Sequence, residues 1–167
     1  GHRYRMFFFL LFCHQHHTRL FLDECFLDLS DEGISMKGYL KAYPELCILK
    51  AFTKSYGMAG VRLGYCLCSD EELLEKMSRT VQPWNVSILA QAAGVAALSE
   101  MQFLAKTKAL IPVERRWLKG ELEALGLWVC PSKANYLLFY GEPELHTTLK
   151  KHGIAIRNCD NYHGLSS

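Results

Sequence analysis

The sequence lacks any apolar stretch long enough to cross a membrane as a helix. Residues 6–12 form an apolar run of seven behind His2, Arg3 and Arg5, whereas a transmembrane helix needs about twenty such residues. A secretory signal peptide needs a longer apolar core and a cleavage site of small residues, and residues 13–17 (CHQHH) supply neither. We therefore expect no membrane partner.

A marked excess of charge of one sign is also missing. The 19 basic and 17 acidic residues leave a net charge of +2 and are spread along the chain, so we expect no nucleic-acid partner. The composition, half hydrophobic and 22% charged, is that of a globular protein, without internal repeats or low-complexity segments. A length of 167 residues fits one ordinary domain or pieces of two.

The seven cysteines lack the spacing of a metal or redox site. Cys66 and Cys68 are separated by one residue, not by the two residues of zinc knuckles and thioredoxin-like motifs. His14 and His17 are one helical turn apart, and a solvated helix end explains them better than a metal site. An odd number of thiols, mostly in apolar surroundings, favours free cysteines in a reducing cytosol. We predict a cytoplasmic protein without a bound metal.

Helical and strand-like segments alternate along the chain, which predicts an α/β fold. The expected strands cover residues 19–26, 46–52, 61–68, 127–130, 135–140 and 154–157. The expected helices cover residues 36–43, 69–79, 87–98, 100–125 and 142–152. Ser69 is predicted to cap the second of these helices, and Pro112 is predicted to interrupt the fourth.

Residues 49–65, LKAFTKSYGMAGVRLGY, carry the most chemical information. An apolar strand leads to Thr53 and Lys54, a glycine-bearing turn follows, and Arg62 stands eight residues after the lysine. This layout holds an amine at the mouth of a sheet with a fixed cation close by. It suits a lysine that forms a Schiff base with a phosphorylated aldehyde cofactor, because a guanidinium offers phosphate a planar fork of donors.

The segment resembles the lysine region of the fold-type I pyridoxal-phosphate enzymes, the class I and II aminotransferases. Within them it resembles the branch that holds histidinol-phosphate aminotransferase and threonine-phosphate decarboxylase. The resemblance implies a three-layer α/β large domain, pyridoxal 5'-phosphate as cofactor, and Lys54 as the residue that binds it. It also implies that Thr53 and Arg62 hold the cofactor phosphate. The ordinary alternative is a surface lysine and arginine beside a loop.

A second motif, residues 20–26 (LFLDECF), reads as a buried strand that ends in acids. Family members have Asp-Glu-Ala-Tyr or Asp-Glu-Ala-Phe about thirty residues before the lysine, so Asp23 is expected to face the pyridine nitrogen and keep it protonated. Strand-ending acids are otherwise often turn or cap residues. Phe26 stands where many relatives have a hydrogen-bonding tyrosine, and phenylalanine there points toward the decarboxylase-like members.

Two motifs in the C-terminal third match the family as well. Residues 131–139 (PSKANYLLF) resemble its serine-x-alanine-asparagine-aromatic strand, which implies that Asn135 faces the substrate. Residues 153–165 (GIAIRNCDNYHGL) resemble the segment that begins with a glycine-isoleucine strand. Arg157 in this segment either contacts substrate or pairs with an acid, and the residues leave both open. The ending NYHGL is closer to the decarboxylase-like branch.

The resemblance spans residues 14–165, part of a full family member, and fades upstream of His14. We expect residues 1–100 to be the C-terminal part of the cofactor-binding large domain, with residues 1–13 outside the family's sequence. Residues 101–167 are expected to form the connecting helix and the small domain. A sheet that needs cover on both faces would then be exposed on one, so the chain alone is expected to be inactive and poorly soluble.

The expected reaction is decarboxylation of L-threonine O-3-phosphate, a phosphorylated amino acid of cobalamin synthesis. Histidinol-phosphate or related aminotransferase activity is the alternative. An inactive scaffold on the same fold is a third reading, but it predicts degenerate cofactor positions, and those of this chain are intact. Family members are usually homodimers, which implies self-association. The small residues of the helix over 87–98 suit either a subunit interface or the interior.

Overall fold

The computed structural model describes the backbone of residues 2–165 and the side chains of residues 5–165. The helices are α1 (His2–Gln15), α2 (Phe52–Ser55), α3 (Glu71–Thr80), α4 (Ile88–Ser99), α5 (Met101–Ala124) and α6 (Leu145–Lys151). The strands are β1 (Leu20–Asp23), β2 (Leu46–Ala51), β3 (Gly64–Cys68), β4 (Trp128–Val129) and β5 (Phe139–Tyr140). Three short 3-10 turns are η1 (Leu27–Leu29), η2 (Met36–Tyr39) and η3 (Ala59–Val61). Helix and strand alternate, so the α/β prediction is confirmed.

The contacts divide the chain into two compact units. The first comprises the residues up to 114 together with 133–135, and the second comprises 115–132 together with the residues from 136 onward. The long helix α5 contributes to both units. The domain limits expected from the sequence, 1–100 and 101–167, stay a prediction.

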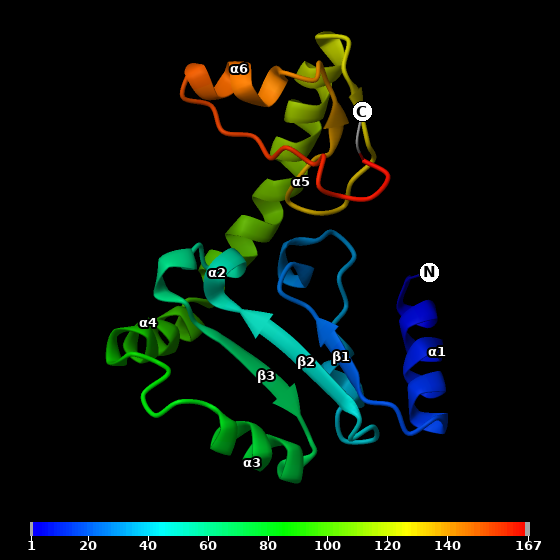
Figure 1. Cartoon of the computed structure of the whole chain (residues 1–167), viewed down its shortest axis with the longest axis vertical. Helices are drawn as coiled ribbons and strands as arrows, with labels where there is room; N and C mark the ends of the chain where they lie inside the picture. Colours follow the sequence, from blue (N-terminus) through cyan, green and yellow to red (C-terminus); the bar gives the residue numbers. More distant parts are fainter. Residues whose placement is uncertain (1, 166–167) are drawn as a thin grey trace. The chain divides into compact units, whose positions relative to one another are not determined.

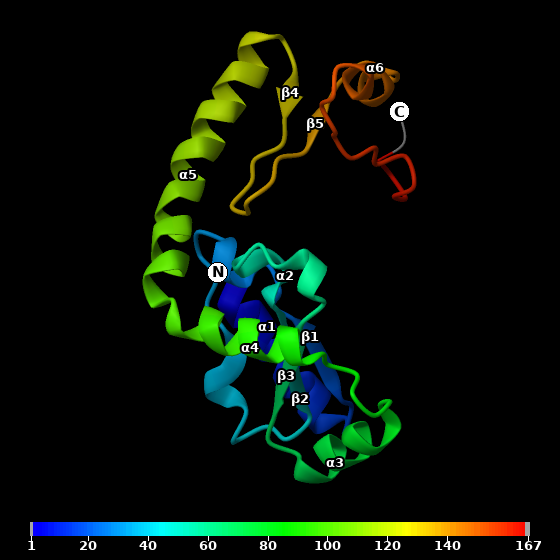
Figure 2. The same ribbon diagram turned by 90° about the vertical axis from the view of Figure 1, so that its left-hand side faces the viewer.

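A three-stranded sheet in the order β1-β2-β3 organises the first unit. β1 and β2 run parallel with Asp23 beside Leu49, and β3 runs antiparallel to β2 with Gly64 beside Ala51. α1 lies on the β1 side of this sheet and α4 on the β3 side (Figures 1 and 2). The register brings the ends of β1 and β2 and the start of β3 to one edge, which we call the site edge.

The core of the first unit lies where α1 packs on the start of β1 and β2. Its buried members are apolar side chains from α1, β1, β2 and η2: Leu10, Cys13, Leu20, Met36, Leu46 and Ile48. Burial of each large aliphatic side chain contributes about 1.5–3 kcal/mol. The main apolar stabilisation of the unit therefore comes from residues at the end of the sheet opposite the site edge.

Helix α4 approaches the site edge closely because it presents small residues to it. Ala90, Gly94 and Ala97 are buried, and a Cβ on Gly94 would lie 2.5 Å from a methyl carbon of Leu63 and 3.8 Å from the Phe52 ring. A larger residue there would push α4 away from Phe52, the buried side chain that anchors α2. The large apolar side chains of α4, among them Ile88, Leu89 and Val95, point outward and are exposed.

The second unit has a small two-stranded sheet. β4 and β5 pair antiparallel, with Trp128 beside Tyr140, and α6 follows. The strand predicted over 154–157 is wrong, because no strand forms there among the described residues. Ile154 instead donates its N–H to the carbonyl of Leu149 at the end of α6, so the backbone closes the helix rather than joining a ladder.

Three further local predictions are corrected by the structure. Asp70, not Ser69, caps α3: its carboxylate accepts the N–H of Leu73 at 2.9 Å, while the Ser69 hydroxyl donates to the carbonyl of Leu40. α5 continues through Pro112, although proline cannot donate the backbone hydrogen bond of its turn. The segment expected as a helix over 36–43 forms only the single turn η2.

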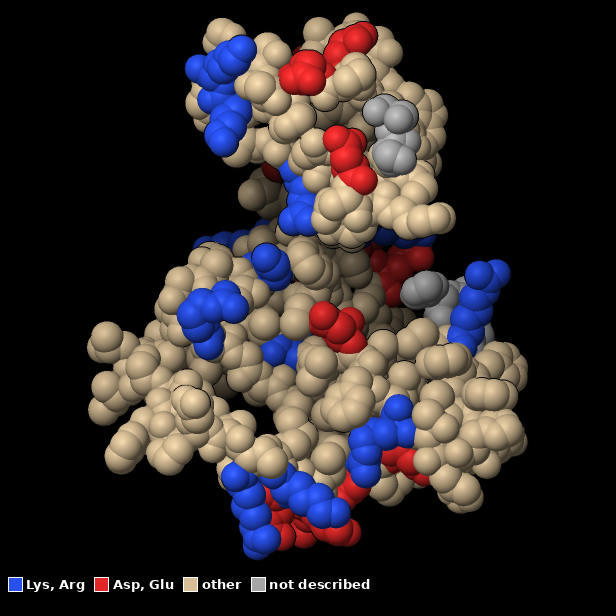
Figure 3. All heavy atoms as spheres, viewed as in Figure 1, with Lys and Arg blue, Asp and Glu red and all other residues tan. Residues whose placement is uncertain are grey.

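The surface shows mixed charge. At α3, acidic and basic side chains lie next to one another (Figure 3) in i,i+4 pairs such as Glu72 with Lys76 and Glu75 with Arg79. Within residues 2–165, no single helix has both the length and the apolar content of a membrane span. α4 and α5 meet that criterion only when they are taken together across a bend of 72°.

Candidate active site

Lys54 lies on the single-turn helix α2, directly after β2. Within this turn Phe52 and Ser55 are buried, whereas Lys54 is exposed and Thr53 is half-buried. Residues three apart share one face of a helix, so the buried pair anchors the turn and the other two side chains face outward. The lysine amine therefore lies at the site edge on a turn that two buried side chains anchor.

The Lys54 amine lies near the loop that follows β1. Its Nζ is 5.5 Å from the centroid of the Phe26 ring, a cation–π contact. Burial raises the pKa of the nearby Cys25 thiol, and the positive charges of Lys50 and Lys54 oppose this rise. Phe26, at the position that the resemblance singled out, thus contacts the lysine with its ring.

Asp23 ends β1 and is exposed at the site edge. Its Oδ1 accepts the N–H of Cys25 at 2.8 Å, and hydrogen bonds from the thiol and the backbone of Cys25 hold the pKa of Asp23 below its usual value. Burial, followed by the hydrogen bond to Asp23, raises the pKa of the Cys25 thiol to about 11. The carboxylate therefore makes a turn contact and remains charged at the edge that carries Lys54.

Arg62 reaches the same edge from the other side of α2. Its guanidinium donates to the carbonyl of Ala59 at 3.1 Å, and the next residue, Leu63, accepts the N–H of Phe52 at 3.1 Å. The backbone of Arg62 is left-handed, with φ of 57°, which is costly for a residue with a Cβ. Such strain in a non-glycine residue clusters at functional sites, and the sequence carried no sign of it.

The two expected substrate residues lie in different parts of the chain. Asn135 is exposed in the segment between β4 and β5 and belongs to the first unit. Arg157 belongs to the second unit, where its guanidinium carbon lies 5.4 Å from the centroid of the Tyr162 ring. It lines a cavity of about 370 Å³ with residues that include His146 and Asn158.

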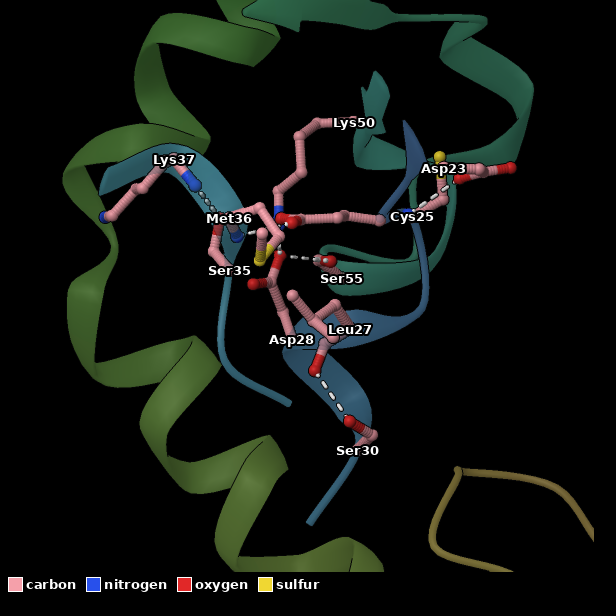
Figure 4. A network of polar contacts seen from close by, with 11 residues as sticks. Asp23, Cys25, Leu27, Asp28, Ser30, Ser35, Met36, Lys37, Lys50 and Ser55 are labelled. Atoms are coloured by element: carbon pink, nitrogen blue, oxygen red, sulfur yellow. Dashed lines mark hydrogen bonds and ion pairs between the residues drawn. The ribbon is translucent and has the colours of Figure 1, made fainter. Parts of the chain in front are cut away.

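A partly buried polar network close to Lys54 in the chain was not predicted from the sequence. Lys50 Nζ lies 2.8 Å from Asp28 and 4.0 Å from Glu24, and the Ser55 hydroxyl donates to Asp28 at 3.3 Å (Figure 4). Glu24 is only 3% exposed, and one of its oxygens accepts the N–H of Met36 at 2.8 Å.

Two signals in the sequence point to this network. Neighbouring residues of a strand face opposite sides, so the inward Leu20 and Leu22 predict that Glu24 is buried and Asp23 is not. A lysine inside the apolar strand 46–51 also requires a carboxylate partner, because an unpaired buried charge is costly. The buried acid at the end of β1 is thus Glu24 rather than Asp23.

Comparison with known proteins identifies the family. The model of the family described as aminotransferase class I and II matches residues 9–164. The chain belongs to this family, whose members depend on pyridoxal phosphate. The family and the fold class expected from the sequence are confirmed.

Similar curated proteins include two phosphate-substrate enzymes by name. A histidinol-phosphate aminotransferase of Anaeromyxobacter sp. is 36% identical over 154 residues, covering 87% of this chain and 41% of the relative. A threonine-phosphate decarboxylase of Salmonella typhimurium is 35% identical over 159 residues, covering 93% of this chain and 44% of the relative. The chain therefore spans less than half the length of these curated relatives.

Solved structures give the same family. The histidinol-phosphate aminotransferase of Clostridium acetobutylicum superposes with a TM-score of 0.85 at 29% identity, covering 95% of this chain and 50% of that one. The histidinol-phosphate aminotransferase of Sinorhizobium meliloti, solved in complex with pyridoxal-5'-phosphate, has a TM-score of 0.71 at 25% identity and covers 84% and 40% of the two chains.

Proposed function

We propose that this chain carries the cofactor lysine of a pyridoxal-phosphate enzyme that acts on a phosphorylated amino acid. The observation that supports the proposal is the sheet register: Asp23 at the end of β1 lies beside Leu49, and Ala51 lies beside Gly64, so the turns that carry Lys54 and Arg62 connect β2 to β3 at this same end. An exposed amine suits an aldehyde, an exposed carboxylate suits a protonated pyridine nitrogen, and a guanidinium suits a phosphate. The residues present fit the cofactor.

Each residue has a distinct task in this proposal. Lys54 Nζ binds the cofactor and later accepts or returns a proton at that nitrogen. Thr53 Oγ1 and the Arg62 guanidinium bind the phosphate, and the left-handed backbone of Arg62 sets the direction of its side chain. The Asp23 carboxylate holds a proton on the facing ring nitrogen. The cofactor, when bound, supplies an electron sink for the carbanion formed on the substrate.

Borohydride reduction in the presence of pyridoxal phosphate tests the proposal. The polypeptide as its gene encodes it is expected to acquire one reduced pyridoxyl group on Lys54, detected by peptide mass spectrometry. Lys76, an exposed lysine of α3, is the matched control and should stay unmodified under the same conditions. Modification of Lys76 and Lys54 to equal extents would overturn a specific cofactor site.

For the substrate, we propose L-threonine O-3-phosphate, with loss of its carboxylate as carbon dioxide. Phe26 in place of tyrosine and the ending NYHGL favour this branch, and the similarity to the Salmonella decarboxylase covers 93% of the chain. Release of carbon dioxide from threonine phosphate is the measurement. The absence of release would remove this choice while leaving the cofactor proposal intact.

Transamination of histidinol phosphate or a related amine is the second candidate. The TM-score of 0.85 with the Clostridium enzyme favours it. Turnover of histidinol phosphate that depends on 2-oxoglutarate, without carbon dioxide release, would select it. A scaffold without activity would show neither reaction and no modification of Lys54.

Asn135 and Arg157 are proposed to bind the substrate. Both side chains are exposed, and an arginine suits an anionic substrate group. Arg157→Ala is expected to raise KM more than it lowers kcat, with Arg79→Ala on α3 as the control. An unchanged KM would instead leave Arg157 with the cation–π contact to Tyr162 alone.

Self-association is proposed through the outward face of α4. Ile88, Leu89 and Val95 on this face are 70–79% exposed, and exposed apolar side chains gathered on one helix mark an interaction surface. Leu89→Glu is expected to convert a homodimer to a monomer in sedimentation, whereas Gln91→Glu is the control. We further propose a cytoplasmic location, without a membrane or nucleic-acid partner.

A further inference from the structure

We propose that Lys50 is a positioning residue, which keeps the acids Asp28 and Glu24 from capturing the amine of Lys54. The inference rests on the proposed function, in which the Lys54 amine has to be free to react. It goes beyond that function by assigning a role to a charge that binds neither cofactor nor substrate. The carrying observation is the partly buried network of Lys50, Asp28 and Ser55, in which Ser55 is the chain neighbour of the reactive lysine.

The geometry shows why a cation is needed at this place. Two carboxylates converge on Lys50, Asp28 at 2.8 Å and Glu24 at 4.0 Å, and the Lys50 side chain is only 12% exposed. One oxygen of Glu24 is buried without a hydrogen-bond partner among the described residues. Without Lys50 these two acids would have no counter-charge close by, and the cluster would attract any other cation within reach.

Lys54 is placed to be that further cation. Ser55, its neighbour in the chain, donates its hydroxyl to the same Asp28 oxygen that binds Lys50 (Figure 4). The Lys54 ammonium lies over Phe26, which stands between Glu24 and Asp28 in the chain. With Lys50 in place, Asp28 is already paired. Without it, the uncompensated carboxylate would draw the Lys54 ammonium away and favour its charged form.

The network also fixes the turn that carries Lys54. α2 has four residues, too few to be stable by its own hydrogen bonds. The bond between Ser55 and Asp28 ties this turn to η1, and the bond between Glu24 and Met36 ties the end of β1 to η2. Displacement of a reacting group by about 1 Å can cost on the order of a hundredfold in rate.

The reactivity of the Lys54 amine toward trace acetic anhydride, followed against pH by mass spectrometry, tests the proposal without using the cofactor. The titratable and charged groups of the site edge that enter this test are Asp23, Glu24, Cys25, Asp28, Lys50, Tyr56, Arg62 and Tyr65, and the Cys25 thiol interacts electrostatically with Lys54. Lys50→Met is expected to move the midpoint for Lys54 upward by about one pH unit or more. At a fixed pH below the midpoint, acetylation would then fall about tenfold.

Variants that restore the charge balance distinguish an electrostatic effect on Lys54 from a general loss of structure. Lys50→Arg keeps the cation and is expected to retain the wild-type midpoint, and the double variant Lys50→Met/Asp28→Asn is expected to move back toward it. Lys76→Met repeats the substitution at an exposed pair, and Ile48→Val loosens the core without touching the network. Neither of these controls is expected to shift the midpoint of Lys54.

Two results would overturn the proposal. One is a Lys54 midpoint in Lys50→Met equal to that of the wild type, and the other is a shift of the same size in Ile48→Val. Should Lys50→Met fail to fold, Asp28→Asn carries the test: it leaves Lys50 less compensated, so the Lys54 midpoint is expected to fall, and no change would again refute the role. Failure of the proposed function shows separately, as absence of pyridoxyl modification in the wild type.

Discussion

The two ends of the β1–β2–β3 sheet differ in how they handle charge. At the site edge, the side chains of Glu24 and Lys50 are 3% and 12% exposed, and Lys50 lies 4.0 Å from Glu24 and 2.8 Å from Asp28. At the opposite end, the ion pairs His14–Glu45 and Arg19–Asp70 lie at the surface, beside the buried leucines 20 and 46. Apolar packing stabilises the end opposite the site edge, whereas partly buried ion pairs position the side chains at the site edge. We therefore propose that stability and the proposed chemistry depend on separate sets of residues in this unit.

The largest expected effect comes from removing the reactive amine at the site edge. Lys54→Ala in the polypeptide as encoded is expected to lower kcat by about 10² to 10⁴-fold, the range of general acid–base catalysis. The free energy of unfolding should change little, because the side chain is exposed. Turnover of threonine phosphate and of histidinol phosphate, the two proposed substrates, together with urea unfolding, checks both parts. A variant with wild-type turnover would refute the role of Lys54.

At the opposite end of the sheet, a substitution is expected to lower stability and to leave substrate binding unchanged. Leu46→Ala removes a side chain that is 0% exposed in the core and is expected to lower the free energy of unfolding by about 2–5 kcal/mol. The KM of the folded fraction should stay near that of the wild type. Leu110→Ala, at an exposed position of α5, is the control. A large change in KM with unchanged stability would contradict the division between the two ends.

Arg62→Gly separates strain from binding at a single residue. Glycine adopts φ of 57° without the penalty of a Cβ, so the free energy of unfolding is expected to rise by up to about 1 kcal/mol. The affinity for pyridoxal phosphate should fall about tenfold or more, because a charge-assisted hydrogen bond is lost. Fluorescence titration measures the affinity, and Arg62→Lys keeps the charge as a comparison. Lower stability in the glycine variant would show that the strain was misjudged.

The smallest expected effect is the pH dependence of stability. The pKa of Asp23 at the site edge is lowered by its hydrogen bonds from Cys25. At the other end, the pKa of Glu45 is also lowered: burial opposes the shift, but its backbone and His14 hydrogen bonds outweigh burial. Carboxyls with depressed pKa values stabilise the fold above their ordinary values of 3.8 and 4.5. That contribution is lost as the pH falls through the folded-state values.

Two variants measure how much each end of the sheet contributes to the loss of stability in acid. Asp23→Asn is expected to make the fall of unfolding free energy below pH 4 shallower, and Glu45→Gln is expected to act independently at the opposite end. Urea unfolding at several pH values measures both. The two effects should add, because the sites share no partner. A non-additive pair would indicate that the ends of the sheet are coupled.

Local patterns in the sequence predicted the elements that position the site. The apolar runs around 20 and 46–51 became β1 and β2, and the Thr53–Lys54 pair does follow a strand end. Periodicity did less well where an element needs a partner far away in the chain. Residues 154–157 have the composition of a strand, but a strand forms only where another backbone offers its hydrogen bonds.

What the sequence by itself determined is the chemical identity of the candidate site. The residue types and spacing of Asp23, Thr53, Lys54 and Arg62 already implied the family that the comparisons show. Tertiary structure alone decided that Lys50 pairs with Asp28 rather than with solvent, that Arg62 has a left-handed backbone, and that α4 turns its small residues inward. The physical reason is that each of these depends on the distance between segments remote in the chain. Spacing along the chain encodes local geometry, whereas folding sets which charges, backbones and faces come into contact.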